Sequence, residues 1–150
     1  MAGVQLEHVG RGDTMGRTTI RAVDDISFTI PEGKYTIILG ASGAGKSTVL
    51  NILGGMDSPT SGRVTVNGRE ISGFNKRQLT EYRRESIGFV FQFYNLMPNL
   101  TVLENVELPL LYAGVSAAER HERAIRSLER VGLADKCKNL PSQLSGGQQQ

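Results

Sequence analysis

The chain carries Gly40-Ala41-Ser42-Gly43-Ala44-Gly45-Lys46-Ser47 between an apolar stretch at residues 35–39 and a segment with helical spacing that begins at Lys46. This run fits the pattern G-x-x-x-x-G-K-[ST] in the strand-then-helix context that the pattern requires. Glycines let the backbone curl with its N–H groups pointing inward, and the start of a helix adds the positive end of its dipole. The run therefore predicts a phosphate-binding loop. A plain Gly-rich turn is the alternative, but a turn needs neither the lysine nor the hydroxyl after it.

The side chains at the end of this loop indicate a nucleoside triphosphate as the ligand. Lys46 would reach the β- and γ-phosphates, and the Ser47 hydroxyl is an oxygen ligand of the kind that Mg²⁺ prefers. Thr48 would cover the α-phosphate side. The residues expected to bind the ligand are Gly40, Ser42, Gly43, Ala44, Gly45, Lys46, Ser47 and Thr48.

A second motif, Leu144-Ser145-Gly146-Gly147-Gln148, lies near the other end of the sequence, and Gln92 follows an apolar run at residues 86–91 between the two. In this order, the three features resemble the nucleotide-binding subunit of an ABC transporter. The resemblance covers nearly all of the chain. Residues 91–96 and 101–106 are similar to the lipoprotein-releasing and macrolide-exporting branch of that family.

The resemblance implies a head-to-tail dimer with a second ABC subunit, in which each subunit presents its signature segment to the γ-phosphate held by the other. Ser145 supplies a hydroxyl, Gly146 and Gly147 allow close approach, and a helix starting there aims N–H groups at an anion. Ser145, Gly146, Gly147 and Gln148 are therefore expected to contact nucleotide. On its own, the same segment is an ordinary loop or helix cap.

Gln92 has a functional and a structural interpretation. By resemblance, its amide oxygen contacts Mg²⁺ and the attacking water, which makes Lys46 and Gln92 the expected catalytic residues and Ser47 and Gln92 the metal ligands. A glutamine after a buried strand otherwise simply hydrogen-bonds a loop. The neighbouring apolar stretch at residues 93–98 is expected either to grip a partner's helix or to pack in the core.

The function implied by the resemblance is that of an ATP-binding subunit with Mg²⁺-dependent ATPase activity in its full-length form. Such a subunit couples ATP binding and hydrolysis to export, or to lipoprotein or peptide handling, by an integral membrane permease. It lies in the cytoplasm, peripheral to the inner face of the membrane. Two alternatives remain: a soluble ABC-type ATPase of DNA repair or translation, and a non-catalytic nucleotide-binding fragment.

Two features of the family have no counterpart in these residues. No apolar strand ends in the acidic residues that hold Mg²⁺ and act on water, so we expect a chain truncated just after the signature and, alone, inactive. Residues 10–17 lack the aromatic that stacks on adenine. Either Arg11 or Arg17 lies over the purine, or this stretch is a flexible surface loop, which leaves the choice between ATP and GTP open.

The composition of the chain limits the kinds of partner and surroundings that we expect for it. The formal net charge of +2 comes from dispersed Lys, Arg, Asp and Glu, so nucleic acid is not expected as a partner. Cys137 is the only cysteine, which suits a reducing compartment. No signal pattern is present, and no apolar run approaches the roughly 20 residues of a membrane helix, so the chain is expected to be soluble.

These patterns predict an α/β fold with a mixed sheet around the phosphate loop. The 150 residues are expected to form one partial ABC-type ATP-binding domain, with a nucleotide-binding α/β part over about residues 1–92 and a helical subdomain over about residues 93–150. Residues 35–39 are expected to be the strand that feeds the phosphate loop, and residues 86–91 a strand in the sheet's interior. Exposed apolar surface is expected where missing strands belong.

Local signals place the other elements. Alternation at residues 4–9 and 26–30 and the pair Asn67-Gly68 predict an N-terminal antiparallel β portion with a tight hairpin. Helices are expected at residues 46–53 and 78–84, the latter capped by Asn75. Capping boxes at Thr101 and Ser116 start two more, and Pro109 is expected to kink or end the first of these.

Overall fold

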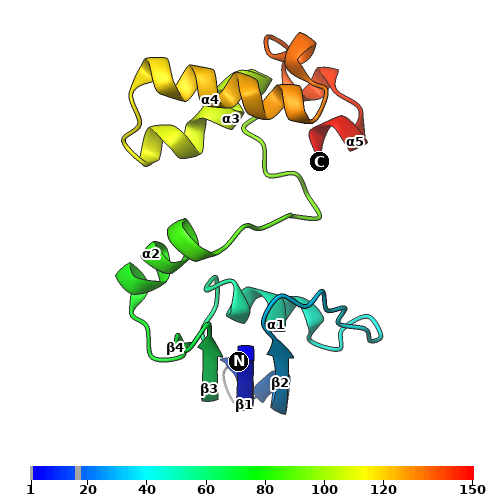
Figure 1. Cartoon of the computed structure of the whole chain (residues 1–150). Helices are drawn as coiled ribbons and strands as arrows, with labels where there is room; N and C mark the ends of the chain where they lie inside the picture. The colour runs from blue at the N-terminus through cyan, green and yellow to red at the C-terminus, as the bar shows by residue number, and fades with distance from the viewer. Residues whose placement is uncertain (1, 16–17) are drawn as a thin grey trace. The chain divides into compact units, whose positions relative to one another are not determined.

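The computed structural model describes residues 2–15 and 18–150. The chain separates into two compact units, Met1–Phe89 and Val90–Gln150, each with its own hydrophobic core. The first unit holds all four strands of the described sheet and two helices, and the described elements of the second are helices joined by turns and irregular chain (Figure 1).

The sheet of the first unit is antiparallel throughout. Its strands are β1 (Ala2–Met15), β2 (Thr18–Pro31), β3 (Ser61–Val66) and β4 (Arg69–Glu70), in the order β2-β1-β3-β4. Asn67 and Gly68 have φ values of 49° and 77°, the left-handed conformation that a primed turn needs at both central positions. The predicted N-terminal β portion and its hairpin are confirmed.

Two helices complete the first unit. α1 (Lys46–Leu53) packs Val49 and Ile52 into a core with Leu6, Val9 and Val64 of the sheet. α2 (Lys76–Ser86) is capped by Asn75, as predicted, and extends beyond the expected residues 78–84 at both ends. The Asn75 side chain accepts a hydrogen bond of 3.0 Å from the N–H of Gln78, whose own side chain accepts one of 2.9 Å from the N–H of Asn75.

The two expected interior strands are not strands. Residues 35–39 and 87–91 join no sheet, and the side chains of Tyr35, Leu39 and Val90 are 91%, 86% and 78% exposed. A parallel strand is stable only when neighbours pair with it and both its faces are covered. All strand pairing among the described residues lies within β1–β4, so the observed sheet is antiparallel rather than mixed. The expected exposed apolar surface is present.

The second unit is built from α3 (Val102–Tyr112), α4 (Ala117–Arg130), two short turns of 3₁₀ helix, η1 (Ala134–Lys136) and η2 (Pro141–Gln143), and α5 (Gly146–Gln149). Its core is small: Val102, Leu128 and Leu144 are buried together. Glu107 of α3 joins the two long helices by an ion pair with Arg120 at 3.5 Å and a hydrogen-bond contact with His121 Nδ1 at 3.1 Å.

The start of α3 satisfies its backbone donors completely. Thr101 and Glu104 form the predicted capping box, and the N–H groups of Val102 and Leu103 donate to the carbonyls of Asn139 and Cys137 at 2.8 and 3.1 Å. The pKa of the Glu104 carboxyl is lowered. The main cause is the hydrogen bond from the Thr101 backbone N–H, and the bond from the Thr101 hydroxyl is the second.

Two predictions for these helices need correction. Pro109 does not end the helix, since α3 runs through it to Tyr112, and the Pro109 carbonyl accepts from the N–H of Ala113 at 3.1 Å. At the start of α4, Ser116 caps the N–H of Glu119 at 3.4 Å, but the reciprocal bond of a capping box is not among those of the described residues. The Glu119 carboxylate pairs with Arg123 instead.

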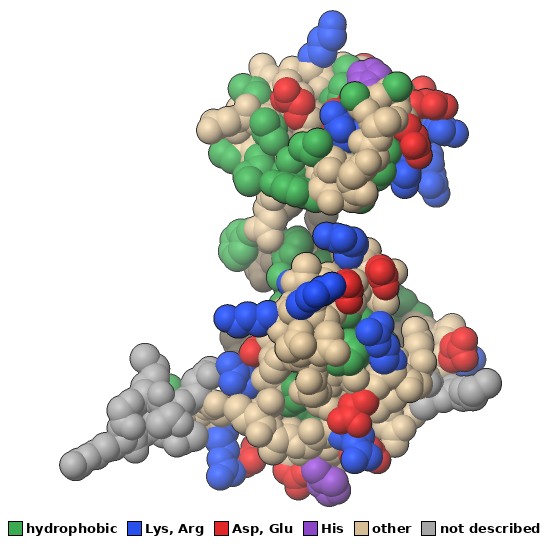
Figure 2. Space-filling model, turned by 90° about the vertical axis from the view of Figure 1, so that its left-hand side faces the viewer, with side chains coloured by type: hydrophobic (Ala, Val, Ile, Leu, Met, Phe, Trp, Pro, Cys, Tyr) green, Lys and Arg blue, Asp and Glu red, His purple; other side chains and the backbone are tan. Residues whose placement is uncertain are grey.

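The described surface mixes charges of both signs. Acidic and basic side chains are interspersed in Figure 2, and several pair along one helix, such as Glu122 with Arg126 at 3.0 Å. Such exposed pairs contribute little to stability. Among the described residues, every helix is too short or too polar to cross a membrane.

Candidate functional site

The phosphate loop is held against β2 by Gly45. This residue has a φ of 83° and precedes the first residue of α1. A Cβ at this position would collide with the carbonyl oxygen of Ala22 and come within 3.2 Å of the Val23 side chain. Only glycine fits both the left-handed backbone and this close approach. The local sequence therefore fixes where α1 begins and which way its first turn points.

The first turn of α1 is open. No side chain caps it, and the first N–H groups of any helix lack partners within the helix. Lys46 Nζ lies across the loop, donating to the carbonyls of Gly40 at 2.8 Å and Ala41 at 2.6 Å. Ser42, Gly43, Ala44 and Ser47 are exposed, and Thr48 is half-buried. The positive end of a helix dipole, with unpaired N–H groups and an ammonium group beside it, suits an anion with several oxygens.

Gln92 belongs to the second unit and lies in a bend of irregular chain. The expected strand before it is absent, so its position at a strand end was wrongly predicted. The residue is exposed.

The signature segment begins on a buried anchor. Leu144 is 8% exposed and belongs to the core of the second unit, whereas Ser145, Gly146 and Gly147 are exposed. Ser145 immediately precedes α5. The backbone N–H of Ser145 donates a hydrogen bond of 2.9 Å to the side-chain oxygen of Gln148. The predicted contact residues thus lie on one short turn, but the Gln148 amide oxygen is engaged within the segment.

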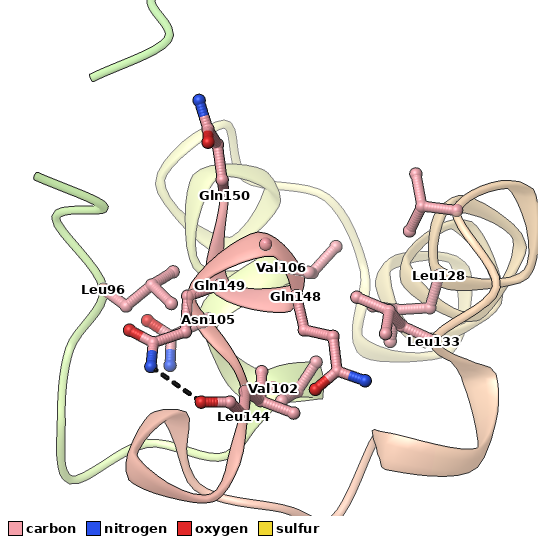
Figure 3. A pocket seen from close by; sticks show the side chains of 12 residues that line it. Leu96, Val102, Asn105, Val106, Leu128, Leu133, Leu144, Gln148, Gln149 and Gln150 are labelled. Atoms are coloured by element: carbon pink, nitrogen blue, oxygen red, sulfur yellow. Dashed lines mark hydrogen bonds between the residues drawn. The ribbon is translucent and has the colours of Figure 1, made fainter. Parts of the chain in front are cut away.

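A cavity of about 450 Å³ lies beside the signature segment. Figure 3 shows Leu96 and Asn105 on one side of it, Leu128 and Leu133 on the other, and Gln148 between them. The Gln149 side chain donates to the Leu144 carbonyl at 3.0 Å. The remaining lining residues are Val102, Val106, Val131, Leu144, Gly147, Gln149 and Gln150.

Two contacts of this region escaped the sequence-based predictions. The Asn105 side chain accepts from the N–H of Met97 at 2.8 Å and donates to three carbonyls, those of Met97, Leu100 and Thr101, at 3.0–3.1 Å. The Tyr94 hydroxyl lies 3.0 Å from the position that a Cβ on Gly146 would take. Sequence patterns between near neighbours do not predict either contact, because both depend on how the chain turns after Gln92.

The two arginines considered for base contact have different outcomes. Arg11 is mostly buried at 23% exposure, and its Nε pairs with Asp57 at 2.8 Å. This pairing removes it as a freely placed platform for a purine. Arg17 lies outside the described residues. In the stretch after Gln92, Phe93 and Met97 are 78% and 51% exposed, so core packing does not hold for them.

The described residues hold no group of three or more His, Cys, Asp or Glu side chains arranged for a metal ion.

Comparisons with known proteins identify the family of the chain. Residues 23–150 match the model of the family described as ABC transporter. An uncharacterized ABC transporter ATP-binding protein of Thermotoga maritima is 54% identical over 136 residues, which are 91% of this chain and 58% of the relative. A macrolide export ATP-binding/permease protein of Burkholderia pseudomallei is 50% identical over 98% of this chain and 22% of its own length.

A solved structure shows the same fold. It is a dimeric ATP-binding cassette in a post-hydrolysis state bound to ADP and Pi, with a TM-score of 0.87 and 43% identity, and it matches 97% of this chain and 65% of its own. The α/β nucleotide-binding fold predicted from the motifs is thus confirmed. The chain spans 58% of the Thermotoga relative. With the family model matching most of its residues, this chain belongs to the ABC transporter family.

Proposed function

We propose that this chain is the ATP-binding part of an ABC transporter subunit that energises export, or lipoprotein or peptide handling, through a membrane permease. The single observation that carries the proposal is the open first turn of α1 beside Lys46, in a chain of this family. Its relatives include a macrolide export ATP-binding/permease protein and a pyoverdine export ATP-binding/permease protein, which favours export over other uses of the fold.

Within this function, the phosphate loop binds the triphosphate of ATP. Lys46 exchanges its bonds to the carbonyls of Gly40 and Ala41 for phosphate oxygens, and the N–H groups of the first turn of α1 hold the others. Because the donors are placed before the ligand arrives, they stabilise developing charge with little reorganisation. Mg²⁺, with the Ser47 hydroxyl as its expected protein ligand in the phosphate loop, would supply further positive charge to the phosphates.

The signature segment would serve a second copy of the subunit. Ser145, Gly146 and Gly147 are exposed, as a surface offered to another chain must be. The proposed arrangement is a head-to-tail dimer, peripheral to the inner face of the membrane through the permease. The solved dimeric cassette with ADP and Pi is consistent with it.

The 150-residue chain alone is proposed to bind nucleotide without steady turnover. No acidic side chain lies beside Gln92 or within the phosphate loop, and hydrolysis in this class of ATPase needs one to hold the metal and one to act on water.

Equilibrium dialysis of the chain against Mg·ATP tests the function. We expect saturable uptake that falls at least tenfold in affinity with Lys46→Ala, which removes an ammonium that contacts phosphate directly. Lys34→Ala is the matched control, since Lys34 is an exposed lysine outside the loop. Equal uptake by wild type and Lys46→Ala, or none by either, would refute the proposal, and steady phosphate release by the chain alone would refute its inactivity.

A further inference from the structure

The helix α1, whose first turn is open at the phosphate loop, is closed at its other end. The last four carbonyls of any helix lack partners within the helix. In α1, three of them accept from backbone N–H groups of the following turn at 2.8–3.2 Å: Leu50 from Gly54, Asn51 from Met56 and Asp57, and Ile52 from Gly55. The fourth carbonyl, that of Leu53, accepts from the Tyr82 hydroxyl at 2.7 Å. A side chain of α2 therefore completes the hydrogen bonding at the end of α1.

Tyr82 reaches this carbonyl because a glycine lets its ring come close. Gly55 has a φ of 66°, and a Cβ on it would lie 2.8 Å from the Tyr82 ring. Tyr82 is only 2% exposed. A buried carbonyl that loses its donor costs more free energy than an exposed one, because water cannot readily replace the donor. The Tyr82 hydroxyl is thus the donor on which this end of α1 depends.

Arg83, the next residue of α2, brings a positive charge to the same end of α1. Its guanidinium donates to the Gly55 carbonyl at 2.5 Å and to the Thr80 hydroxyl at 3.1 Å, and the second bond fixes its orientation. None of the residues in the last turn of α1 is basic. A cation beside the C-terminus of a helix offsets the negative end of the helix dipole. Arg83 therefore supplies a charge that α1 does not carry itself.

The position of one end of α1 determines that of the other. The helix has eight residues and is about 12 Å long, and a helix this short is not stable without tertiary contacts. Val49 and Ile52 pack into the core, so a tilt about these residues displaces both ends. Gly45 packs closely on the Ala22 carbonyl at the N-terminal end, and the contacts with α2 fix the C-terminal end. The direction of the first N–H groups depends on both.

We propose that Tyr82 and Arg83 are positioning residues for the phosphate loop. By fixing the C-terminal end of α1, they hold its first turn in the orientation that binds phosphate. Both residues and the loop belong to the same compact unit. Without these contacts the folded chain spends less time in the binding orientation, and the apparent affinity falls in proportion. This inference rests on the proposed function, because it assigns the two residues to the ATP site.

Amide NMR of the nucleotide-free chain tests whether the two ends of α1 are connected. Tyr82→Phe removes only the hydroxyl, and Arg83→Gln replaces the guanidinium with a shorter neutral amide. We expect both variants to shift the resonances of residues 46–48 as well as those of residues 53–55. Arg84→Gln, at an exposed arginine of α2, is the matched control and should leave residues 46–48 unmoved. Unmoved resonances at residues 46–48 in both test variants would overturn the proposal.

Equilibrium dialysis against Mg·ATP measures the consequence for binding. Tyr82→Phe and Arg83→Gln should each lower the affinity by about two- to fivefold, while Arg83→Lys, which keeps the charge, should retain most of it. Ile71→Val is the control for general stability. It removes a methyl group from a core residue that is 4% exposed and leaves both bonds to the end of α1 in place, so it should bind as the wild type does.

The outcomes separate the two proposals. Wild-type affinity in Tyr82→Phe and Arg83→Gln, or an equal loss in Ile71→Val, would overturn the positioning role and leave ATP binding intact. An absence of uptake by the wild type would overturn the proposed function, and the positioning role with it. Retained amide dispersion of β1–β3 shows that a variant has folded. If Tyr82→Phe fails this check, the comparison of Arg83→Gln with Arg83→Lys and Arg84→Gln decides.

Discussion

The starts of α1 and α3 differ in whether the first N–H groups, which have no partner within a helix, find hydrogen-bond acceptors elsewhere. α3 has a threonine cap, a reciprocal glutamate and carbonyls from Asn139 and Cys137 on its first N–H groups. α1 has a left-handed glycine in place of a cap, and among the described residues no side-chain cap hydrogen bond closes its first turn. The comparison teaches that a closed helix start contributes to stability, whereas an open one keeps its donors for an anion.

The largest expected effect concerns the glycine that leaves α1 open. Gly45→Ala should destabilise the first unit by about 2 kcal/mol or more, because it adds a left-handed alanine and a collision with the Ala22 carbonyl. Gly43→Ala, at φ 80° but facing open space, should cost only about 1–2 kcal/mol. Urea unfolding of the two variants gives the difference, and equal costs would show that the contact with β2 is unimportant.

A second substitution tests how much the hydrogen bonds of Asn105 stabilise the start of α3. Asn105→Ala should lower the free energy of unfolding of the second unit by about 2 kcal/mol, since four hydrogen bonds to residues 97–101 are lost. Asn99→Ala, at an exposed asparagine nearby, should change it by less than about 0.5 kcal/mol. Thermal melts followed by helical circular dichroism measure both, and similar melts would remove Asn105 from this role.

The cap of α3 should contribute less. Thr101→Ala deletes the oxygen that accepts from the N–H of Glu104 at 3.3 Å, and such a loss typically costs about 1 kcal/mol. Thr101→Ser keeps that oxygen and should retain most of the stability. If both variants unfold at the same urea concentration as the wild type, the bonds from the N–H groups of Val102 and Leu103 to the carbonyls of Asn139 and Cys137 are enough to stabilise the helix start.

The smallest effect is the pH dependence of the same cap. The folded pKa of Glu104 is lowered by its hydrogen bonds to Thr101, so the unfolded state takes up a proton at a higher pH than the folded state. The contribution is therefore present above the ordinary glutamate pKa and is lost as pH falls through the folded value. Glu104→Gln, which keeps a capping side chain without a charge, should flatten this part of the profile. An unchanged profile would contradict the assignment.

The same comparison explains what the sequence could predict. The helix starts at Lys46, Asn75 and Thr101 follow from residue types within a few positions of one another, and all three were predicted. The expected strands at residues 35–39 and 86–91 were wrong because a strand depends on partners elsewhere in the chain, and the antiparallel strands supply none. The apolar pattern identified strand-forming side chains, but it carried no information about pairing.

The candidate site divides in the same way. The phosphate loop is a contiguous pattern, and its structural context could be inferred from its neighbours. The contacts of Tyr94 with Gly146 and of Asn105 with residues 97–101 depend on how the chain turns after Gln92, and an aromatic or an asparagine in the sequence does not specify such contacts. Tertiary packing, rather than local propensity, decides them.

The lack of sheet pairing at residues 35–39 has a consequence for the thermodynamics of ligand binding. The phosphate loop is secured on its helical side by Gly45, but the chain leading into it carries exposed Tyr35, Ile37 and Leu39. Ordering a residue costs about 1–2 kcal/mol of conformational entropy. Calorimetry of Mg·ATP binding to this chain should therefore show a favourable enthalpy opposed by an unfavourable entropy. Any binding partner that pairs with this stretch would raise nucleotide affinity without touching the nucleotide.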